Sequence, residues 1–507
     1  MKQILFVFIL IISFFSISTK LYADYTTPGT SVSWNLNDLV TNSGGTVTFT
    51  GGNYFINSNL TVSSSDTLKI LSNATVKLAL NSVLLVNGTL IINPPDSVKF
   101  TSIDTTQKFT ELRLDGASST SFFNKFIYEY SFNGLRLLNV SPNFSNCTFR
   151  YNCNGNGSTT VPALNLFNSN PVITNTLFYR NYRAAIAGGA NIANAPQILN
   201  CQFIENNLLN GNVPQINLGT TGSTTAIIRG NLITGGNSIQ TGAIAVAALL
   251  GGTINVIIEN NVIKRNRYGI TIQAGVSNAI IRGNIIDTNN IQNSPNLGGS
   301  GINIVGSGVT AIVSKNYIRG NLWGITTQQR ANLILGDLSN SDTNYIGLNQ
   351  IYGNHNSGIF YDLYNNTINP IKAENNYWGT TNIDTVEAHI VHQPDNDSGF
   401  VDYLPIWTLT GISPINTEIP SKYMLYDAYP NPFNPQTNIR FDIPESGNVK
   451  ITVYDLTGRE IDVLFDQFVN AGNYEVQFNG ESYSSGVYFY SIRTDKFANT
   501  KKLVLVK

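Results

Sequence analysis

Residues 256–289 read VIIENNVIKRNRYGITIQAGVSNAIIRGNIIDTN, and one short phrase occurs twice in this stretch. The first copy consists of Ile258, Asn261, Ile263 and Asn266, and the second copy begins at Ile281 with the same internal spacing. A phrase that returns after 23 residues indicates a repeat architecture, in which each repeat is one structural unit. The rest of the chain can therefore be searched for further copies of this phrase.

The phrase occurs eight times between residues 147 and 354, at spacings of 23 to 33 residues. Variable spacing in this range is typical of a solenoid, whose coils stack on one another. Helical periodicity is absent, and short aliphatic runs are bounded by Asn and Gly, which favours short strands. We therefore predict an all-β chain with a parallel β-helix, and the handedness of parallel crossovers favours a right-handed one. The anchor positions, where the first Asn or its substitute stands, are Cys147, Thr176, Cys201, Asn231, Asn261, Asn284, Asn316 and Asn349.

Two columns of the repeat contain only apolar residues, as expected of side chains that point into a core, where an unpaired polar group is costly. The column three residues before the anchor is Phe144, Ile173, Ile198, Ile228, Ile258, Ile281, Val313 and Ile346. The column two residues after it is Phe149, Phe178, Phe203, Ile233, Ile263, Ile286, Ile318 and Ile351.

A third column, five residues after the anchor, contains Asn with a single Gly. These two residues tolerate positive φ, so we predict a left-handed backbone position and a corner of the coil there. The members of this column are Asn152, Asn181, Asn206, Gly236, Asn266, Asn289, Asn321 and Asn354.

Composition and the N-terminus limit the possible functions. Charged residues are 12% of the 507 residues and the net charge is −1, which argues against nucleic-acid binding. Residues 1–23 combine a basic start, an apolar run and a small residue at Ala23, which predicts a secretory signal peptide. We expect no transmembrane helix after its removal. The three cysteines are predicted to be small core residues, although a Cys147–Cys153 disulfide stays open as the alternative.

The rod is predicted to span residues 24–407, with residues 24–59 as its N-terminal cap and residues 373–407 as its C-terminal cap. The stretch from Leu85 to Ser102 and the segment AENNYWGT at 373–380 resemble the opening coils and the last coil of secreted bacterial right-handed β-helix repeat proteins. That resemblance implies their fold. Trp378 lies in an inward column, so we predict that it closes the core, with sugar stacking as the alternative.

A change in composition marks the C-terminal part of the chain. Residues 408–421 contain Gly and Pro and are predicted to form a linker, and residues 422–507 to form a small Ig-like β-sandwich. Its short strands are predicted at residues 438–443, 449–454, 461–465, 474–478, 487–492 and 502–506. This tail resembles the C-terminal sorting domain of the type IX secretion system, with a hook-cap Ig-like domain as the alternative. The resemblance implies export across a Gram-negative outer membrane, the secretion machinery as partner, and a secreted or cell-surface location. The matching motifs include Pro430, Asn431, Pro432, Gly458, Gly486, Lys501 and Lys502.

Residues that could carry chemistry on the rod are few. Between Lys125 and Tyr345 there are six acidic residues and no histidine, so a general base is hard to place. Charges of opposite sign alternate on successive coils, as in Arg229, Glu259 and Arg282, which predicts ladder pairing. The residues that no column explains are the candidates for ligand binding, namely Arg180, Arg183, Arg265, Arg267, Tyr268 and Trp323.

Tyr268 and Trp323 each precede a Gly-Ile strand, and the insertion at residues 290–299 lies between them in sequence and is predicted to wall a groove. Asp384, Asp395 and Asp397 are the candidate ligands for a structural calcium ion, with a solvated acidic cap as the alternative; otherwise no cofactor is expected. The leading hypothesis is a secreted rod that binds or structures extracellular polysaccharide without catalysis. The alternatives are a lyase, epimerase or glycosidase acting on an acidic glycan, and an adhesin.

Overall fold

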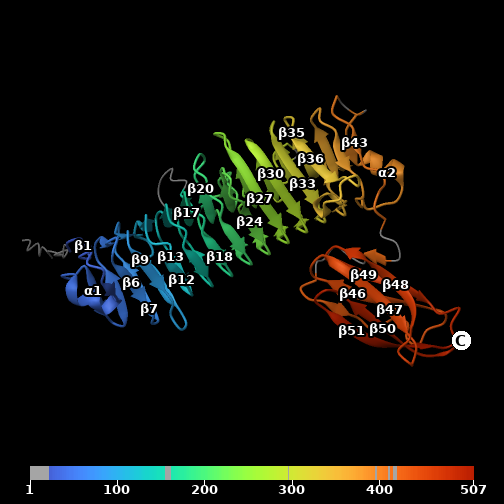
Figure 1. Cartoon of the computed structure of the whole chain (residues 1–507), viewed down its shortest axis with the longest axis horizontal. Coiled ribbons are helices and arrows are strands. Elements are labelled where there is room, and N and C mark those ends of the chain that lie inside the picture. Colours follow the sequence, from blue (N-terminus) through green and yellow to red (C-terminus); the bar gives the residue numbers. More distant parts are fainter. Residues whose placement is uncertain are drawn as a thin grey trace, which may run out of the picture.

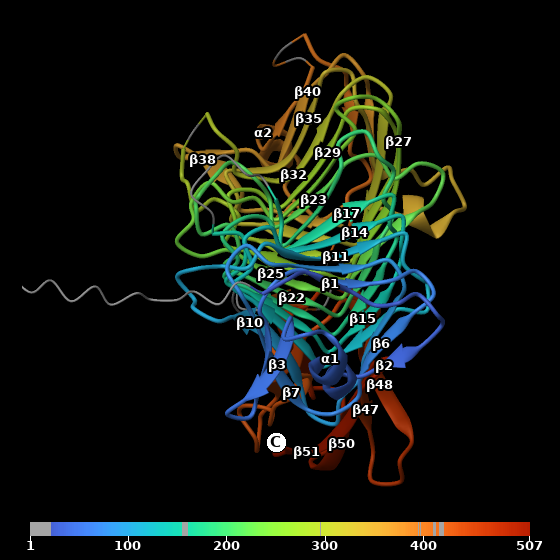
Figure 2. The ribbon, with the colours of Figure 1, turned by 90° about the vertical axis from the view of Figure 1, so that its left-hand side faces the viewer.

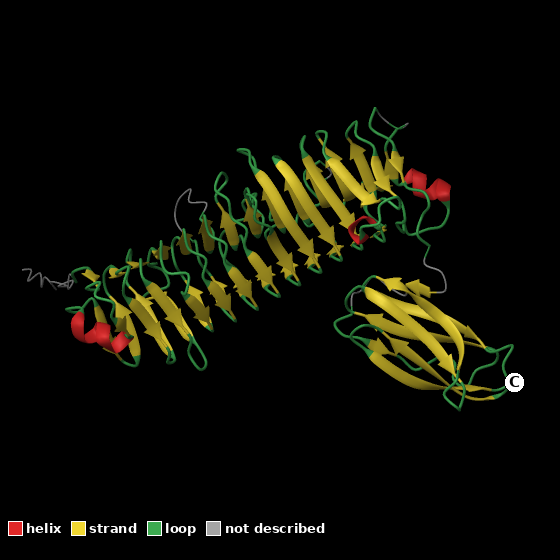
Figure 3. Cartoon of the chain, in the orientation of Figure 1, coloured by secondary structure: helices red, strands yellow, loops and turns green. Residues whose placement is uncertain are grey.

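The computed structural model describes residues 22–154, 161–294, 296–393, 395, 397–408, 412–414 and 420–507. Most of the predicted signal peptide and of the predicted linker therefore lies outside the described residues. A long rod of stacked strands is followed by a smaller β domain, which lies beside the C-terminal end of the rod (Figure 1). Strands dominate and helices occur near the two ends of the rod (Figure 3).

Three long sheets form the sides of the rod, and almost all of their strands pair in parallel. An end-on view shows the coils stacked along the rod axis (Figure 2). The predicted parallel β-helix is thereby confirmed as the architecture.

Sheet A has 14 strands. They are β1 (Tyr25–Thr26), β5 (Leu60–Val62), β8 (Val83–Val86), β11 (Glu111–Asp115), β14 (Leu135–Leu138), β17 (Leu164–Phe167), β20 (Ile186–Gly188), β23 (Ile216–Leu218), β26 (Ile244–Ala247), β29 (Ile270–Gln273), β32 (Ser300–Val305), β35 (Trp323–Gln328), β40 (Leu363–Asn366) and β42 (Ile390–Val391).

Sheet B has 14 strands. They are β2 (Ser33–Trp34), β6 (Thr67–Ile70), β9 (Thr89–Ile92), β12 (Phe122–Asn124), β15 (Asn143–Ser145), β18 (Val172–Thr174), β21 (Gln197–Leu199), β24 (Ala226–Arg229), β27 (Thr253–Glu259), β30 (Val276–Arg282), β33 (Val309–Ser314), β36 (Asn332–Gly336), β41 (Ile371–Ala373) and β43 (Val401–Asp402).

Sheet C has 13 strands, and its first pair, β3 and β4, is antiparallel. The strands are β3 (Val47–Thr50), β4 (Asn53–Ile56), β7 (Ala74–Leu78), β10 (Val98–Ser102), β13 (Phe126–Glu129), β16 (Thr148–Arg150), β19 (Leu177–Tyr179), β22 (Gln202–Ile204), β25 (Leu232–Thr234), β28 (Val262–Lys264), β31 (Ile285–Asp287), β34 (Tyr317–Arg319) and β37 (Gln350–Ile351).

The inward columns predicted from the repeat form the core. The column from Phe149 to Ile351 is in continuous register along sheet C, and all its members are fully buried. The column from Phe144 to Val313 is in register along sheet B. Its predicted last member is wrong: Ile346 follows the 3-10 helix η1 (Thr343–Tyr345) and is only half-buried, because residues 337–346 are an insertion between β36 and the anchor Asn349.

The corner column also needs a correction. The left-handed residue is the one before the corner Asn, as at Arg180 (φ 49°) and Arg265 (φ 56°), and not the Asn itself. This residue makes the turn, so the following Asn side chain is buried inside the corner. There Asn181 Nδ2 donates to Asn206 Oδ1 at 2.8 Å, and Asn152 donates to Asn181 in the same way at 3.0 Å. Hydrogen bonding between coils therefore explains why Asn recurs at this position along the rod.

A glycine interrupts this corner ladder, and a glutamine bridges the gap. Gly236 has no side chain to offer, and a Cβ there would come within 2.6 Å of the Glu205 side chain. Gln215 accepts from Asn206 Nδ2 at 2.9 Å and donates to Asn266 Oδ1 at 3.0 Å. The ladder then continues through three further coils to Asn354, whose amide donates to the buried carboxylate of Asp362 at 2.9 Å.

A second ladder runs through the anchor column. Asn231, Asn261, Asn284, Asn316, Asn349 and Asn376 are joined by amide-to-amide hydrogen bonds of 2.8 to 3.0 Å. Each amide also donates to a backbone carbonyl and accepts a backbone N–H, as Asn261 does from Asn231 N and to Ile228 O. Buried amides with all partners satisfied rigidify a core and fix its register.

The predicted charge ladder is present on the outer surface of sheet B. Glu259 forms ion pairs with Arg229 and, at 2.6 Å, with Arg282 on the two neighbouring strands. On sheet C, Arg319 pairs with Asp287 at 3.2 Å. These ion pairs account for Arg229, Arg282 and Arg319, as the alternation of charges predicted.

We predict that Glu259 makes the stability of the rod depend on acid. Burial opposes its ionisation, but hydrogen bonds from Arg282 and Arg229 outweigh burial and hold the pKa of Glu259 below the usual glutamate value. A lowered pKa stabilises the fold above the unfolded-state pKa, and that stabilisation is lost as the pH falls through the folded-state pKa. Glu259→Gln should cost about 1–2 kcal/mol at pH 7 and much less near pH 3. Urea denaturation at both pH values checks this, and a pH-independent difference would contradict it.

Both ends of the core are closed. At the N-terminal end, helix α1 (Leu36–Asn42) buries Leu36 and Leu39, and Asn35 and Asp38 form a capping box. At the other end Trp378 is 1% exposed within the main core, as predicted for a residue that closes it. Helix α2 (Ile383–Ala388) and the hairpin of β38 (His355–Asn356) and β39 (Ile359–Phe360) lie near this end.

The C-terminal domain consists of two antiparallel sheets of four strands each, packed around their own core. All six strands predicted from the sequence form, as β46 to β51, and β44 lies within the predicted linker. Ala471 of this domain packs against Ile285 and Tyr317 of sheet C. The strands are β44 (Ile412–Pro414), β45 (Met424–Leu425), β46 (Gln436–Ile443), β47 (Gly447–Tyr454), β48 (Glu460–Val469), β49 (Gly472–Asn479), β50 (Gly486–Arg493) and β51 (Ala498–Leu505).

Two further expectations concern the cysteines and the membrane. Cys147, Cys153 and Cys201 are all buried and free, so the alternative of a disulfide is wrong. Burial raises the pKa of the Cys147 and Cys201 thiols to about 12. In the part of the chain that the structure describes, no helix is long and apolar enough to cross a bilayer.

Candidate functional site: an uncharged face of sheet A

The outer face of sheet A carries one column of side chains that runs along much of the rod. Because side chains alternate along a strand, these residues point outward while their neighbours fill the core. From β17 to β40 the column contains no charged residue, and by a rung spacing of about 4.8 Å it extends for about 34 Å. Its members, in register, are Asn165, Ala187, Asn217, Ala245, Thr271, Asn303, Thr326 and Tyr364.

A hollow of about 320 Å³ lies at the C-terminal end of this face. We call it the Trp323 hollow. Strands β32, β35 and β40 form its floor, and the predicted insertion forms part of its wall. It is lined by Asn296, Gly298, Ser300, Asn303, Trp323, Thr326, Gln328, Tyr364 and Asn366.

The polar side chains on the floor hold one another in place. Asn303 Oδ1 accepts hydrogen bonds from Thr326 Oγ1 at 2.8 Å and from Gln328 Nε2 at 3.2 Å. Ser300 and Thr326 share a further hydrogen bond of 3.1 Å between their hydroxyls. Since the carbonyl oxygen of Asn303 takes both of these bonds, its amide N–H groups are left to donate to a ligand.

Trp323 is half-buried and its ring is fixed by two tyrosines. Its ring centroid lies 4.5 Å from that of Tyr361 and 5.2 Å from that of Tyr364, the latter nearly edge-on at 82°. Such contacts stabilise the ring orientation. The insertion wall is supported from behind by Arg267, because a Cβ on Gly298 would lie 2.9 Å from Arg267 Nε.

Tyr268, the predicted partner of Trp323, does not reach this hollow. Its ring lies over Gly242 on the preceding coil, where a Cβ would come within 2.0 Å of Tyr268 Cζ. Burial raises the pKa of Tyr268 to about 12. Tyr268 therefore occupies a space that the glycine leaves open, and only Trp323 of the two aromatic candidates lines the hollow.

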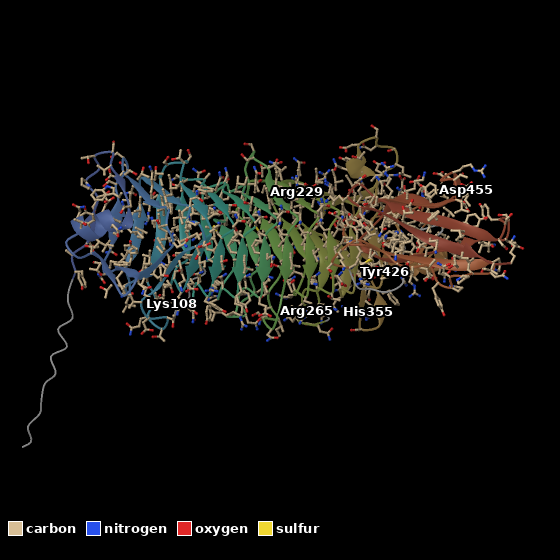
Figure 4. The ribbon with its side chains drawn as sticks, turned by 90° about the horizontal axis from the view of Figure 1, so that it is seen from below. Lys108, Arg229, Arg265, His355, Tyr426 and Asp455 are labelled. Atoms are coloured by element: carbon tan, nitrogen blue, oxygen red, sulfur yellow. The ribbon has the colours of Figure 1, made fainter. Side chains whose placement is uncertain are left out.

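The four candidate arginines are spread over the rod. Arg180 pairs with Glu205 at 3.7 Å, and Arg267 donates to Asn212. Arg265 is exposed on a corner of the coil, where Figure 4 labels it. Only Arg183 lines a hollow, of about 460 Å³, which also lies on the sheet A face and includes Arg136, Asn165 and Asn217. The structure therefore does not gather the four into one basic site.

Acidic and metal-binding groups are not concentrated on this face. None of the side chains that line the Trp323 hollow is acidic or a histidine. Among the described residues no three His, Cys, Asp or Glu side chains come together in a way that could hold a metal ion, so Asp384, Asp395 and Asp397 do not form a site of that kind.

Sequence reasoning missed the floor of the hollow. Asn303, Thr326 and Tyr364 each follow the first inward residue of a sheet A strand, after Ile302, Ile325 and Leu363. Alternation along the Gly-Ile strands would have identified Asn303 and Thr326 as outward residues. Tyr364 was harder to find, because the hairpin β38–β39 separates it from the repeat phrase.

The motif segment around Asn431 contacts the basic end of the tail in the C-terminal domain. Asn431 Nδ2 donates to Lys502 O, and Asn431 Oδ1 accepts from Val504 N, both at 2.9 Å. Lys501 Nζ lies 2.6 Å from an Asp427 carboxylate oxygen. The segment that contains Pro430 and Pro432 is thereby attached to the last strand β51. Gly458 has a φ of 82° in the turn between β47 and β48, and Gly486 begins β50.

Comparison with known proteins identifies this domain. No curated protein and no solved structure matches the chain. Residues 427–507 match the family described as a secretion system C-terminal sorting domain. The protein therefore carries the sorting signal of the type IX secretion system, and it is secreted or displayed on the surface of a Gram-negative bacterium.

Proposed function

We propose that the exported rod binds extracellular polysaccharide in the Trp323 hollow without catalysis. We also place the rod with the secreted right-handed β-helix repeat proteins of bacteria. The export signal limits the ligands to those outside the cell, and the uncharged outer column of sheet A suits a long polymer that lies along the rod.

One observation carries this proposal: a half-buried tryptophan stands beside amide and hydroxyl groups, with no charge among the lining side chains. An aromatic face packs against the C–H groups of a sugar ring, while amides and hydroxyls exchange hydrogen bonds with its hydroxyls. Because neighbouring rings fix Trp323 and neighbouring strands fix Asn303, little ordering is needed on binding.

The same composition disfavours hydrolysis or elimination at this hollow. Both reactions need a positioned acid or base, and within the part of the chain that the structure describes the hollow is lined by no carboxylate, histidine or lysine, so that the Tyr364 phenol is its one titratable side chain. The hollow around Arg183 and Arg136 offers positive charge for a sugar carboxylate, so a lyase-type activity there is the alternative that product assays must address.

We predict that Trp323→Ala weakens binding of neutral polysaccharide about 5-fold to 150-fold, since aromatic anchors at the centre of a site contribute about 1–3 kcal/mol. Affinity electrophoresis and calorimetry with a panel of neutral and acidic polysaccharides measure this. Trp323→Phe should retain part of the affinity, because it keeps an aromatic face.

Arg265→Ala is the matched control, since Arg265 is exposed and lies outside the hollow. Equal losses in Trp323→Ala and Arg265→Ala, or no binding to any polymer of the panel, would contradict the proposed site. The appearance of unsaturated sugars or new reducing ends would replace a binding function with an enzymatic one.

A further inference from the structure

A second hollow, of about 640 Å³, lies near the N-terminal end of the rod on the edge between sheets C and A. We call it the Tyr130 slot. The turns that follow β13 and β19 provide aromatic residues, and the loop between β10 and β11 provides the opposite wall. It is lined by Leu80, Asn81, Thr105, Thr106, Gln107, Lys108, Tyr130, Phe132, Asn154 and Tyr182.

The aromatic side of this slot consists of Tyr130 and Phe132, which follow β13, and Tyr182, which follows β19 two coils later. Tyr130 stacks on Tyr151 of the next coil, with ring centroids 5.5 Å apart and planes 18° from parallel. Tyr151 in turn contacts the ring of Tyr179 at 5.8 Å. Because Tyr151 lies behind Tyr130 and is not part of the slot lining, the ring of Tyr130 is supported from one side and faces the slot with the other.

The opposite wall is a short loop that its own hydrogen bonds hold in shape. Asp104 Oδ1 accepts from Thr106 N and Thr106 Oγ1, each at 2.8 Å. Phe132 N donates to Phe109 O at 2.8 Å, which ties the loop to the aromatic side. Backbone and side-chain hydrogen bonds thus fix the two adjacent coils that border the slot.

Amide side chains at the rim are available to a ligand. Within the described residues, the side chains of Asn81, Gln107 and Asn154 make no hydrogen bond, although each lines the slot. Each carries both a donor and an acceptor group. A sugar ring can pack its C–H groups against an aromatic ring and form hydrogen bonds with free amide groups around it.

The charge near the slot favours a neutral sugar. Lys108 is the one charged residue among the described side chains of the lining, and Asp104 lies close enough to act on it electrostatically. Lys108 Nζ also donates to Thr105 O at 3.3 Å, within its own loop. Partial burial lowers the pKa of Lys108, which reflects a cation already poorly exposed to water. The pair of opposite charges leaves little net attraction for an acidic group.

We propose that the Tyr130 slot is a second carbohydrate site, which takes a neutral pyranose ring between Tyr130 and the loop of residues 103–108. The slot lies beside the coil that contains β14. The Trp323 hollow lies on the coil that contains β35, which is seven rungs further along sheet A. At about 4.8 Å per rung the two sites are about 34 Å apart. Figure 4 shows Lys108, Arg265 and His355 along one long edge of the rod, so the slot shares an edge with the later coils.

Two sites on one rigid rod allow a single polymer to bind at both, so the affinity for long chains should exceed that for short ones through effective concentration. The test uses the full chain after export. Calorimetry is performed with neutral hexasaccharides (cellohexaose, xylohexaose and mannohexaose) and with the matching long polymers, and a uronate hexasaccharide serves as the acidic probe. Tyr130→Ala and Gln107→Ala address the slot, and Arg265→Ala is the control, since Arg265 is exposed and lines neither the slot nor the Trp323 hollow.

We expect Tyr130→Ala and Gln107→Ala to lower the number of bound neutral hexasaccharides from two to one, and to weaken binding of the long polymer about tenfold or more. Arg265→Ala should keep both sites. An unchanged stoichiometry in both slot variants, a preference for the uronate probe, or no binding of any neutral hexasaccharide would overturn the proposal. Loss of binding in Tyr130→Ala but not in Trp323→Ala would retain the slot and refute the Trp323 hollow, so the two failures are distinguishable.

Discussion

Deletion of residues 427–507 is expected to abolish appearance of the rod outside the cell. The deletion removes the whole region that matches the sorting domain family, which has its own hydrophobic core. Because the rod core is a separate cluster that ends at its own aromatic cap, it should fold without the tail. The truncated protein should therefore accumulate, folded, in the periplasm of a bacterium with a type IX system.

The measurement is cell fractionation combined with protease accessibility on intact cells. The reciprocal experiment joins residues 422–507 to a periplasmic reporter protein, which should then reach the surface or the medium. As a matched control, Arg440→Ala changes one exposed side chain of the domain, whose ion pair with Glu475 contributes little at the surface. Surface exposure of the truncated rod, or retention of the reporter fusion in the periplasm, would contradict the assignment of the export signal.

The sequence predicted the rod well because its signal is repeated. A polar residue in either inward column would lower the stability of its coil, so the apolar residues at the aligned positions of successive coils all indicate the same fold. The six strands of the C-terminal domain were also predicted from alternation and turn residues. Ile346 was misplaced because a constant offset of three residues before the anchor was assumed, whereas residues 337–346 are inserted between β36 and Asn349.

The corner column shows a different limit. Asn tolerates positive φ, but so do other residues when a structure requires it, and here Arg180 and Arg265 adopt that conformation instead. The column of asparagines does mark the corner of each coil, but Asn is selected there by the amide ladder inside the corner and not by its backbone conformation. Sequence reasoning from one residue's backbone preference cannot separate these two causes, because both select Asn.

The candidate sites were predicted least well, since they depend on contacts between coils. Trp323 was identified, but its floor comes from three strands that only the register brings together. The Tyr130 slot was not predicted at all. Its walls combine residues about 50 to 100 positions apart, such as Leu80 and Tyr182, and none of them belongs to the repeat phrase.

Gln215→Ala is expected to destabilise the middle of the rod by about 2–4 kcal/mol, because it opens the amide ladder at the coil where Gly236 already lacks a side chain. Gln215 makes three hydrogen bonds of good length: from Asn206 Nδ2 at 2.9 Å, to Asn266 Oδ1 at 3.0 Å and to Thr234 O at 3.1 Å. Their loss leaves buried polar groups without partners, which costs more than the bonds themselves contribute.

The cost should be local, since each coil contacts only its neighbours and the two halves of the rod can open separately. Hydrogen exchange should accelerate in β22, β25 and β28 and remain unchanged in β7 and β36. Gln202→Ala is the matched control: Gln202 is an exposed glutamine on a neighbouring strand, and its substitution should alter stability by less than about 0.5 kcal/mol.

A second substitution distinguishes the loss of the Gln215 hydrogen bonds from the loss of packing that any smaller side chain would cause. Gln215→Leu fills the same space without donors or acceptors, so it should be about as destabilising as Gln215→Ala if the ladder matters, and close to neutral if only packing matters. Asn206 and Asn266 then have no side chain between them with which to bond, because they stand two coils apart. The continuity of the ladder therefore depends on Gln215, which lies outside the repeat phrase. Gly236, in the asparagine column, marks the coil where the Gln215 side chain replaces the missing amide.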